Sequence, residues 1–191
     1  MKVEYIGGAY NPGEYPPMEL PEVCFMGRSN VGKSSLINCL VRQRQMARVS
    51  RTPGRTQALH FFSVADRFTL VDFPGYGYAK APKKIRAQFL PLINSYLDTR
   101  EVLAGGLLLM DSRRDPRKDE TDLIEAFAAR KMPLVLVVTK IDKLAKTRRA
   151  GRVQQLAKQL KIPQQRAVGF SALKGDGRDK VVQQIDRLIG G

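Results

Sequence analysis

The chain has 191 residues, of which 43% are apolar, so it fits one compact globular domain with a substantial core. Its longest apolar runs, near 102–110 and 133–138, are far too short to cross a bilayer, which excludes a membrane-spanning protein. The net charge of +15 leaves two alternatives open: a polyanionic partner, such as nucleic acid or an anionic membrane surface, or a generically basic protein.

Glycines and prolines are frequent over residues 7–21, which predicts an irregular N-terminal arm over residues 1–21 that leads into a domain over residues 22–191. The first residues, MKVEYIGGAYNP, lack a long apolar core after a basic start, so we expect no signal peptide. We therefore expect a soluble, cytoplasmic protein.

From Glu22 onward, short apolar runs alternate with helical patterns. A short turn at Ala65–Arg67 joins two of the runs and predicts a hairpin, and Pro91 predicts a kink or break in a helix. The fold class is α/β with three layers: a mostly parallel six-stranded sheet with one antiparallel strand and helices on both faces. The predicted strands are Glu22–Met26, Leu59–Val64, Phe68–Asp72, Leu107–Met110, Leu134–Thr139 and Ala167–Phe170, and the predicted helices are Ser34–Val41, Pro82–Leu97, Asp119–Arg130, 152–160 and Val181–Ile189.

The segment Gly27–Ser34 matches the phosphate-binding pattern G-x-x-x-x-G-K-[ST], between a predicted strand and a predicted helix. Glycines let the backbone wrap tightly so that amide groups point at phosphate oxygens, and the helix N-terminus favours anions. Lys33 would reach the β- and γ-phosphates, and Ser34 would be a ligand of Mg²⁺. The nucleotide-binding residues of this loop are Gly27, Arg28, Ser29, Asn30, Val31, Gly32, Lys33 and Ser34.

A second motif, Asp72-Phe73-Pro74-Gly75, follows the strand Phe68–Asp72. Because Asp72 ends that strand, its carboxylate would face Mg²⁺ through water. The amide of Gly75 is placed to donate a hydrogen bond to the γ-phosphate. We therefore place Lys33 and Gly75 in the catalytic machinery.

A third motif, Thr139-Lys140-Ile141-Asp142, follows the strand Leu134–Thr139 and predicts selection of guanine. The Asp142 carboxylate can accept hydrogen bonds from guanine N1–H and N2–H₂, a donor pair that adenine lacks. The usual first residue of this motif is Asn, so Thr139 would anchor the phosphate-binding loop more weakly. The segment Ser171-Ala172-Leu173 would complete the base pocket.

Two predicted switches surround the site. The first is the long basic stretch Arg42–Gln57, where Thr56 is the candidate to close on Mg²⁺ and the γ-phosphate, and Thr52 is the alternative. The second is Phe73–Lys84, which is rich in Gly and Tyr.

The motifs GRSNVGKSSLIN (27–38), PGRTQ (53–57), DFPGYGYAK (72–80) and TKID (139–142) together resemble the EngB (YihA/YsxC) family of P-loop GTPases, from about Pro21 to the C-terminus. The resemblance implies a GTPase that assists assembly of the large ribosomal subunit and is required for normal cell division and septation. DFPG replaces the usual DLPG. The resemblance also implies that Thr56 is a second Mg²⁺ ligand and that the nucleotide contacts include Gly54, Arg55, Thr56, Gln57 and Ala58.

Many GTPases place a Gln after the glycine of the second motif to orient the attacking water, but here Tyr76 follows Gly75. We expect this ring to turn away, so hydrolysis should be slow without a partner. Asn30 matches the Asn that some related GTPases use to bind K⁺. Arg28, Arg51 and Arg55 are either internal arginine fingers or arginines that face solvent or RNA.

Basic residues concentrate outside the nucleotide loops, which favours ribosomal RNA phosphates as partners over surface solubility alone. No known base-reading motif is present, and we expect a monomer with no membrane association. A GTP-dependent RNA- or protein-binding module with little hydrolysis is the main alternative function, and a P-loop kinase is another. Cys24 and Cys39 are interpreted as small core hydrophobes rather than as a disulfide or a metal site.

Overall fold

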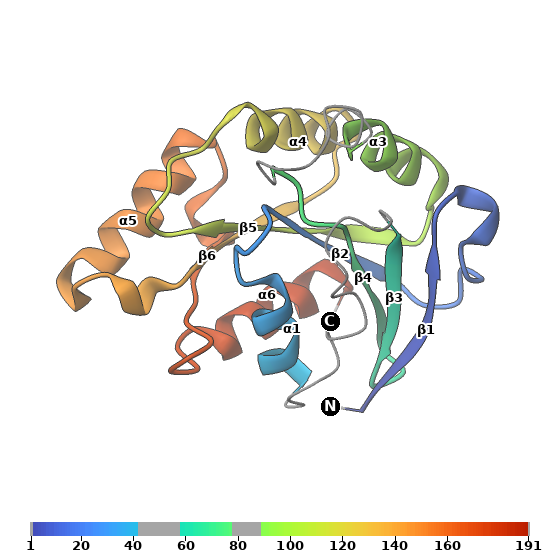
Figure 1. Ribbon diagram of the computed structural model, residues 1–191, viewed down its shortest axis with the longest axis horizontal. Coiled ribbons are helices and arrows are strands. Elements are labelled where there is room, and N and C mark those ends of the chain that lie inside the picture. The colour runs from blue at the N-terminus through green and yellow to red at the C-terminus, as the bar shows by residue number, and fades with distance from the viewer. Residues whose placement is uncertain (1, 42–57, 78–88, 191) are drawn as a thin grey trace.

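The computed structural model describes residues 2–41, 58–77 and 89–190 of the chain (Figure 1). Its centre is a seven-stranded sheet in the order β1-β3-β4-β2-β5-β6-β7. Strand β3 is antiparallel to both β1 and β4, and the pairs from β4 to β7 are parallel, so one strand runs against all the others. The strands are β1 Val3–Ala9, β2 Glu22–Gly27, β3 Leu59–Val64, β4 Phe68–Asp72, β5 Leu103–Asp111, β6 Leu134–Thr139 and β7 Ala167–Gly169.

Helices cover both faces of the sheet, which confirms the predicted three-layer α/β fold (Figure 1). One core contains apolar side chains of α3, α4 and α5, and the other contains those of α1 and α6. The helices are α1 Lys33–Val41, α3 Phe89–Thr99, α4 Lys118–Ala129, α5 Lys146–Gln159 and α6 Arg178–Leu188.

The prediction of six strands is wrong, because the sheet has a seventh strand, β1, inside the expected irregular arm. This edge strand buries only Val3 and Ala9, so its side chains carry little strand periodicity. Backbone pairing with β3 holds it, and the register shifts between Tyr5 and Gly7. The remainder of the arm includes a short 3-10 helix, Pro12–Glu14.

Three predicted elements differ from the observed ones in extent. Strand β5 begins at Leu103 rather than Leu107, because two glycines let it pack where no side chain fits: a Cβ on Gly105 would lie 2.7 Å from the carbonyl oxygen of Pro133. Helix α5 begins at Lys146, well before residue 152, since its first turns are polar and solvent-facing. Pro91 is the third residue of α3 as described, in a first turn that tolerates proline, and the predicted helical residues before residue 89 lie outside the described residues. Among the described residues, no helix is long and apolar enough to cross a membrane.

Candidate nucleotide-binding site

Four loops meet at the carboxyl ends of the parallel strands, where α/β sheets bind ligands. The phosphate-binding loop follows β2, and Asp72 ends the neighbouring strand β4. The segment from Thr139 follows β6, and the segment from Phe170 follows β7, which pairs with β6. The sheet therefore brings the three sequence motifs and the 171–173 segment to one edge of the molecule.

The backbone of the phosphate-binding loop has the turns that its sequence predicts. Asn30 and Gly32 adopt positive φ values of 63° and 108°, and α1 begins directly afterwards at Lys33. A Cβ on Gly27 would lie 2.8 Å from Val31 Cγ1, so the loop closes on itself only because residue 27 is glycine. The first turn of α1 consequently presents its amide groups at the carboxyl end of β2, an arrangement that favours an anion.

Lys33 forms an ion pair with Asp72, the last residue of β4. Both side chains are largely buried, which places a cation and a carboxylate side by side next to the phosphate-binding loop. Ser34, in the first turn of α1, is exposed. A serine hydroxyl and a carboxylate oxygen suit Mg²⁺, which keeps several waters and takes few protein ligands. No cluster of three or more His, Cys, Asp or Glu side chains suited to a metal occurs among the described residues.

The second motif is joined to the phosphate-binding loop by backbone pairing. The Ser29 amide donates to the Tyr76 carbonyl at 2.8 Å, and the Tyr76 amide donates to the Gly27 carbonyl at 3.3 Å. The Ser29 hydroxyl donates to the Gly75 carbonyl at 3.1 Å. A Cβ on Gly75 would lie 3.1 Å from Ser29 Cα, so glycine permits this close approach.

Tyr76 points into the core and not toward the phosphate-binding loop, as expected from the sequence. Its side chain is 6% exposed, and its ring centroid lies 4.7 Å from that of Phe89 in α3. Burial raises the pKa of the Tyr76 hydroxyl well above its ordinary value. Arg28 lies on the same side and donates hydrogen bonds to Gly77 O and to Asp119 of α4, each at 3.3 Å.

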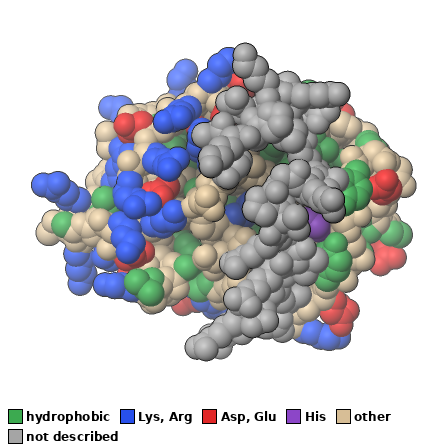
Figure 2. Space-filling model, in the orientation of Figure 1, with side chains coloured by type: hydrophobic (Ala, Val, Ile, Leu, Met, Phe, Trp, Pro, Cys, Tyr) green, Lys and Arg blue, Asp and Glu red, His purple; other side chains and the backbone are tan. Residues whose placement is uncertain are grey.

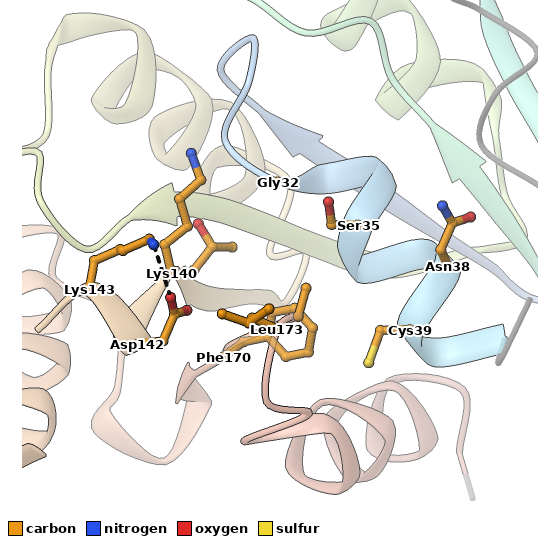
Figure 3. Close-up of a pocket in the computed structure, with 11 residues that line it drawn as sticks. Gly32, Ser35, Asn38, Cys39, Lys140, Asp142, Lys143, Phe170 and Leu173 are labelled. Atoms are coloured by element: carbon orange, nitrogen blue, oxygen red, sulfur yellow. Dashed lines mark ion pairs between the residues drawn. The ribbon is translucent and has the colours of Figure 1, made fainter. Parts of the chain in front are cut away.

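A cavity of about 690 Å³ lies between α1 and the loops that follow β6 and β7 (Figure 3). Six of the predicted nucleotide contacts line it: Gly32, Thr139, Lys140, Asp142, Ala172 and Leu173. The lining residues that the sequence analysis missed are Ser35, Asn38, Cys39, Lys143 and Phe170. Ser35 and Asn38 lie on α1, the helix that follows the phosphate-binding motif. Their place on this helix is the feature of the sequence from which they could have been predicted.

The interpretation of both cysteines as core residues is confirmed for Cys24, which is fully buried, and holds in part for Cys39, which packs against the core without being fully buried. Cys39 is only partly buried and lines the cavity (Figure 3). The next residue of α1, Leu40, is buried in the core. Cys39 points elsewhere because neighbouring positions of a helix point about 100° apart. Both thiols are free.

The third motif is tied to the phosphate-binding loop at two points. The Thr139 hydroxyl lies 2.7 Å from the Val31 carbonyl, which gives it the contact that a residue at this position was expected to make. Lys140 adopts a left-handed conformation, and its ammonium group donates to the Asn30 carbonyl at 2.7 Å. The same ammonium group lies 3.0 Å from a carboxylate oxygen of Asp111, at the end of β5.

Asp142 accepts a hydrogen bond of 2.7 Å from the Ser171 hydroxyl, which lowers the pKa of this carboxyl group below its ordinary value. Ser171 in turn accepts a hydrogen bond from the Lys174 amide and is fully buried. Lys143 lies 3.8 Å from the other oxygen of Asp142 (Figure 3). The Asp142 carboxylate, which lines the cavity, is therefore ionised and held in place by the 171–174 loop, whose Leu173 is 78% exposed.

Part of the predicted site lies outside the described residues. The residues concerned are both threonines of the first switch, Thr52 and Thr56, the neighbouring Gly54, Arg55 and Gln57, Arg51, and residues 78–84 of the second switch. Ala58 is described and is buried just before β3. Ile141, Phe73 and Pro74 support the loops from within, with Ile141 and Phe73 buried in the core.

Comparison with known proteins gives consistent matches. Residues 22–140 match a family model described as "50S ribosome-binding GTPase". The chain is 46% identical to the probable GTP-binding protein EngB of Desulforapulum autotrophicum over 98% of this chain and 96% of that protein. It is 44% identical to the probable EngB of Syntrophotalea carbinolica over 96% of this chain and 88% of that protein.

Solved structures agree on the fold. A crystal structure of a probable GTP-binding protein EngB matches 88% of this chain and 98% of its own, with a TM-score of 0.74 at 22% identity. The G domain of the FeoB iron transporter of T. maritima matches 89% of this chain and 99% of its own, with a TM-score of 0.57 at 26% identity.

Proposed function

This chain belongs to the EngB family of GTP-binding proteins, P-loop GTPases that hydrolyse GTP to GDP and phosphate, and we propose that it is a slow nucleotide-dependent switch in assembly of the large ribosomal subunit. It acts in the cytoplasm as a monomer and is also required for normal cell division and septation. The observation that carries the proposal is the convergence of the phosphate-binding loop, Asp72 and Asp142 at one edge of the sheet, beside a strongly basic surface.

Each part of the site has a role in this proposal. The backbone of residues 27–33 and the Lys33 ammonium group hold the β- and γ-phosphates, and the Asp142 carboxylate selects guanine. Ser34, Thr56 and Asp72 would hold Mg²⁺, which when bound neutralises the charge that develops on the phosphates. The Gly75 amide donates to the γ-phosphate. Gly54–Ala58 and the 171–173 loop complete the nucleotide contacts.

Slow hydrolysis follows from the position of Tyr76. The side chain after Gly75 is where many GTPases carry the group that orients water, and here it is packed against Phe89. A phenol held in the core cannot reach water at the γ-phosphate. The water must therefore be oriented by another group. Turnover becomes fast only when a partner orders the two switches. Stimulation by K⁺ through Asn30 remains a prediction.

A ribosomal partner is supported by the family description and by the charge of the surface. Lys and Arg side chains gather over the side of the molecule formed by α5 (Figure 2). Helix α5 has no acidic residue in its 14 positions. Among the described residues, no ion pair involves Arg114, Lys146, Arg148 or Lys158, so their charges are available to RNA phosphates.

The alternative is a binding module that retains GTP and hardly hydrolyses it, and the buried Tyr76 is the observation that favours it. Single-turnover hydrolysis of GTP, measured with and without large-subunit precursor particles, separates the two functions. We expect at least about a tenfold acceleration by the particles, whereas small-subunit particles leave the rate unchanged. Particles that bind in the GTP state without any acceleration would establish the binding module instead.

A further inference from the structure

We infer that α5 is also a regulatory site for nucleotide release: an RNA backbone bound to the N-terminal half of α5 draws Arg149 away from Asp176 and loosens the guanine pocket. The inference rests on the proposed function, because it takes RNA as the partner. It adds a consequence of binding, namely that RNA promotes exchange of the nucleotide.

The RNA-binding part of the proposal is the exposed start of α5. Lys146 and Arg148 are exposed, and no ion pair involves either of them within the described parts of the chain. Arg149 follows directly, with its side chain 19% exposed. Arg152, one turn further on, donates to the carbonyl oxygens of Ser112 and Arg114 and to Asp115. Because Arg152 fixes the helix to the loop after β5, a bound phosphate acts on the side chains at the start of α5 rather than on the helix position.

Arg149 connects this surface to the loop after β7. Its Nη1 donates to Asp176 Oδ2 at 3.2 Å, and its Nε donates to the Leu144 carbonyl at 3.2 Å. The Asp176 side chain is 43% exposed, and Arg149 is its ion-pair partner. Because the Asp176 carboxylate is open to solvent, this pair is weaker than a fully buried one, and a stronger anion can replace Asp176. A phosphate, which binds arginine in a bidentate manner, can therefore compete with Asp176 for the guanidinium group.

Asp176 is joined by a hydrogen bond to Ser171, the residue that orients the Asp142 carboxylate. The Asp176 carbonyl accepts a hydrogen bond of 3.0 Å from the Ser171 amide. The Ser171 hydroxyl donates to Asp142 at 2.7 Å. The glycines on both sides of Asp176 have φ values of 70° and 81°, so the loop turns sharply there, and a Cβ on Gly177 would overlap the Gly169 carbonyl. Release of Asp176 thus removes a constraint on the turn that positions Ser171, and through it Asp142.

The direction of the effect follows from linkage. If RNA binds better when Arg149 is free, it lowers guanine-nucleotide affinity, and bound nucleotide lowers RNA affinity by the same factor. Both GTP and GDP are affected alike, because the linked residues face the base and not the γ-phosphate. RNA at this surface therefore promotes nucleotide exchange without distinguishing GTP from GDP.

The test measures release of a fluorescent GDP analogue into excess GDP, with and without poly(U), while binding of labelled poly(U) is followed separately by anisotropy. We expect poly(U) to accelerate release by about fivefold or more, the lower range of ordinary allosteric coupling. The double variant K146A/R148A loses both poly(U) binding and acceleration. Asp176→Asn releases the nucleotide fast without RNA, and poly(U) adds nothing further. The matched control, K131A/R187A, removes the same charge after α4 and at the end of α6, and behaves as the unmodified chain.

Two outcomes overturn the inference and are distinct from failure of the proposed function. If poly(U) binds through Lys146 and Arg148 but release is unchanged, the coupling is wrong while the RNA partner stands. If poly(U) still accelerates release from the Asp176→Asn variant, the coupling does not pass through Arg149 and Asp176. If poly(U) does not bind at all, the RNA contact of the proposed function fails as well. Thermal unfolding of each variant confirms that it is folded.

Discussion

At the scale of single residues, the proposed guanine selection depends on the Asp142 carboxylate and on the Ser171 hydroxyl that orients it. Asp142 lies at the wall of the cavity, and the hydrogen bond from Ser171 lowers its pKa, so it is ionised at neutral pH. An ionised carboxylate accepts from both donors on the guanine edge. Against adenine the same carboxylate would lose both base donors, and we propose that this penalty excludes the wrong base.

Asp142→Asn should exchange the base preference of the site. An amide can donate to the additional carbonyl oxygen of xanthine, while it cannot accept both guanine donors. We expect GTP affinity to fall by about 10- to 100-fold, which corresponds to about 1–3 kcal/mol for unpaired polar groups, and affinity for xanthosine triphosphate to rise. Equilibrium binding of fluorescent analogues measures both values. Lys131→Ala is the control, since this exposed side chain follows α4 and does not line the cavity, so both affinities should change little. Unchanged preference in Asp142→Asn would refute the assignment.

At the scale of elements, a buried ion pair joins the start of β2 to the end of α3. Arg100 forms hydrogen bonds with both carboxylate oxygens of Glu22, and Tyr96 also donates to Glu22. The side chains of Arg100 and Glu22 are 4% and 2% exposed. Arg100 additionally donates to the Pro16 carbonyl at 3.0 Å, so the same cation holds the N-terminal arm against the sheet. This cluster fixes the C-terminal end of the helix that follows the second switch.

Arg100→Ala should destabilise the protein by about 3–5 kcal/mol, because it leaves Glu22 buried without its cation. Urea unfolding followed by circular dichroism measures the free energy of unfolding. Arg130→Ala is the matched control: its partner Asp98 is exposed, with a bond of 2.7 Å, so the loss should be much smaller. Equal losses in the two variants would mean that burial of the Glu22–Arg100 pair contributes nothing to stability.

At the scale of the whole molecule, positive charge gathers over α5 on the face that Figure 2 shows. The net charge is +15, and Lys and Arg side chains concentrate over α5 in Figure 2. Binding to a polyanion through such a surface is driven by release of condensed counterions. Affinity must then depend steeply on salt, and each phosphate contact contributes to the slope.

Affinity for large-subunit particles should fall as salt rises, with a linear relation between the logarithms of the binding constant and of the salt concentration. Removing Lys146 and Arg148 together should reduce the magnitude of that slope by about 1.4–1.8, the value for two phosphate contacts. Filter binding or sedimentation from about 50 to 200 mM KCl measures it. The K131A/R187A variant should keep the full slope, and binding that is insensitive to salt in the unmodified chain would contradict phosphate contacts altogether.

Local chemistry in the sequence was sufficient for most elements and for the location of the site. Strands β3, β4 and β6 have the bounds that the sequence predicts, and every residue of β4 and β6 is buried, as in strands covered on both faces. The phosphate-binding loop was recognisable because its glycines, lysine and serine are contiguous in the chain. Strand β1 was missed because backbone pairing with a distant strand, and not side-chain burial, holds it.

The sequence by itself therefore determined the fold class and the family, since these depend on short-range periodicity and contiguous motifs, while the residues that it assigns to phosphate and guanine remain predictions. Only the tertiary structure decided that Tyr76 packs on Phe89, that Cys39 lines the cavity, and that Lys140 bridges Asn30 and Asp111. It also decided that Arg149 contacts Asp176 beside the guanine pocket. These contacts join residues far apart in the chain, and packing of the helices on the sheet, which no local pattern specifies, sets their distances.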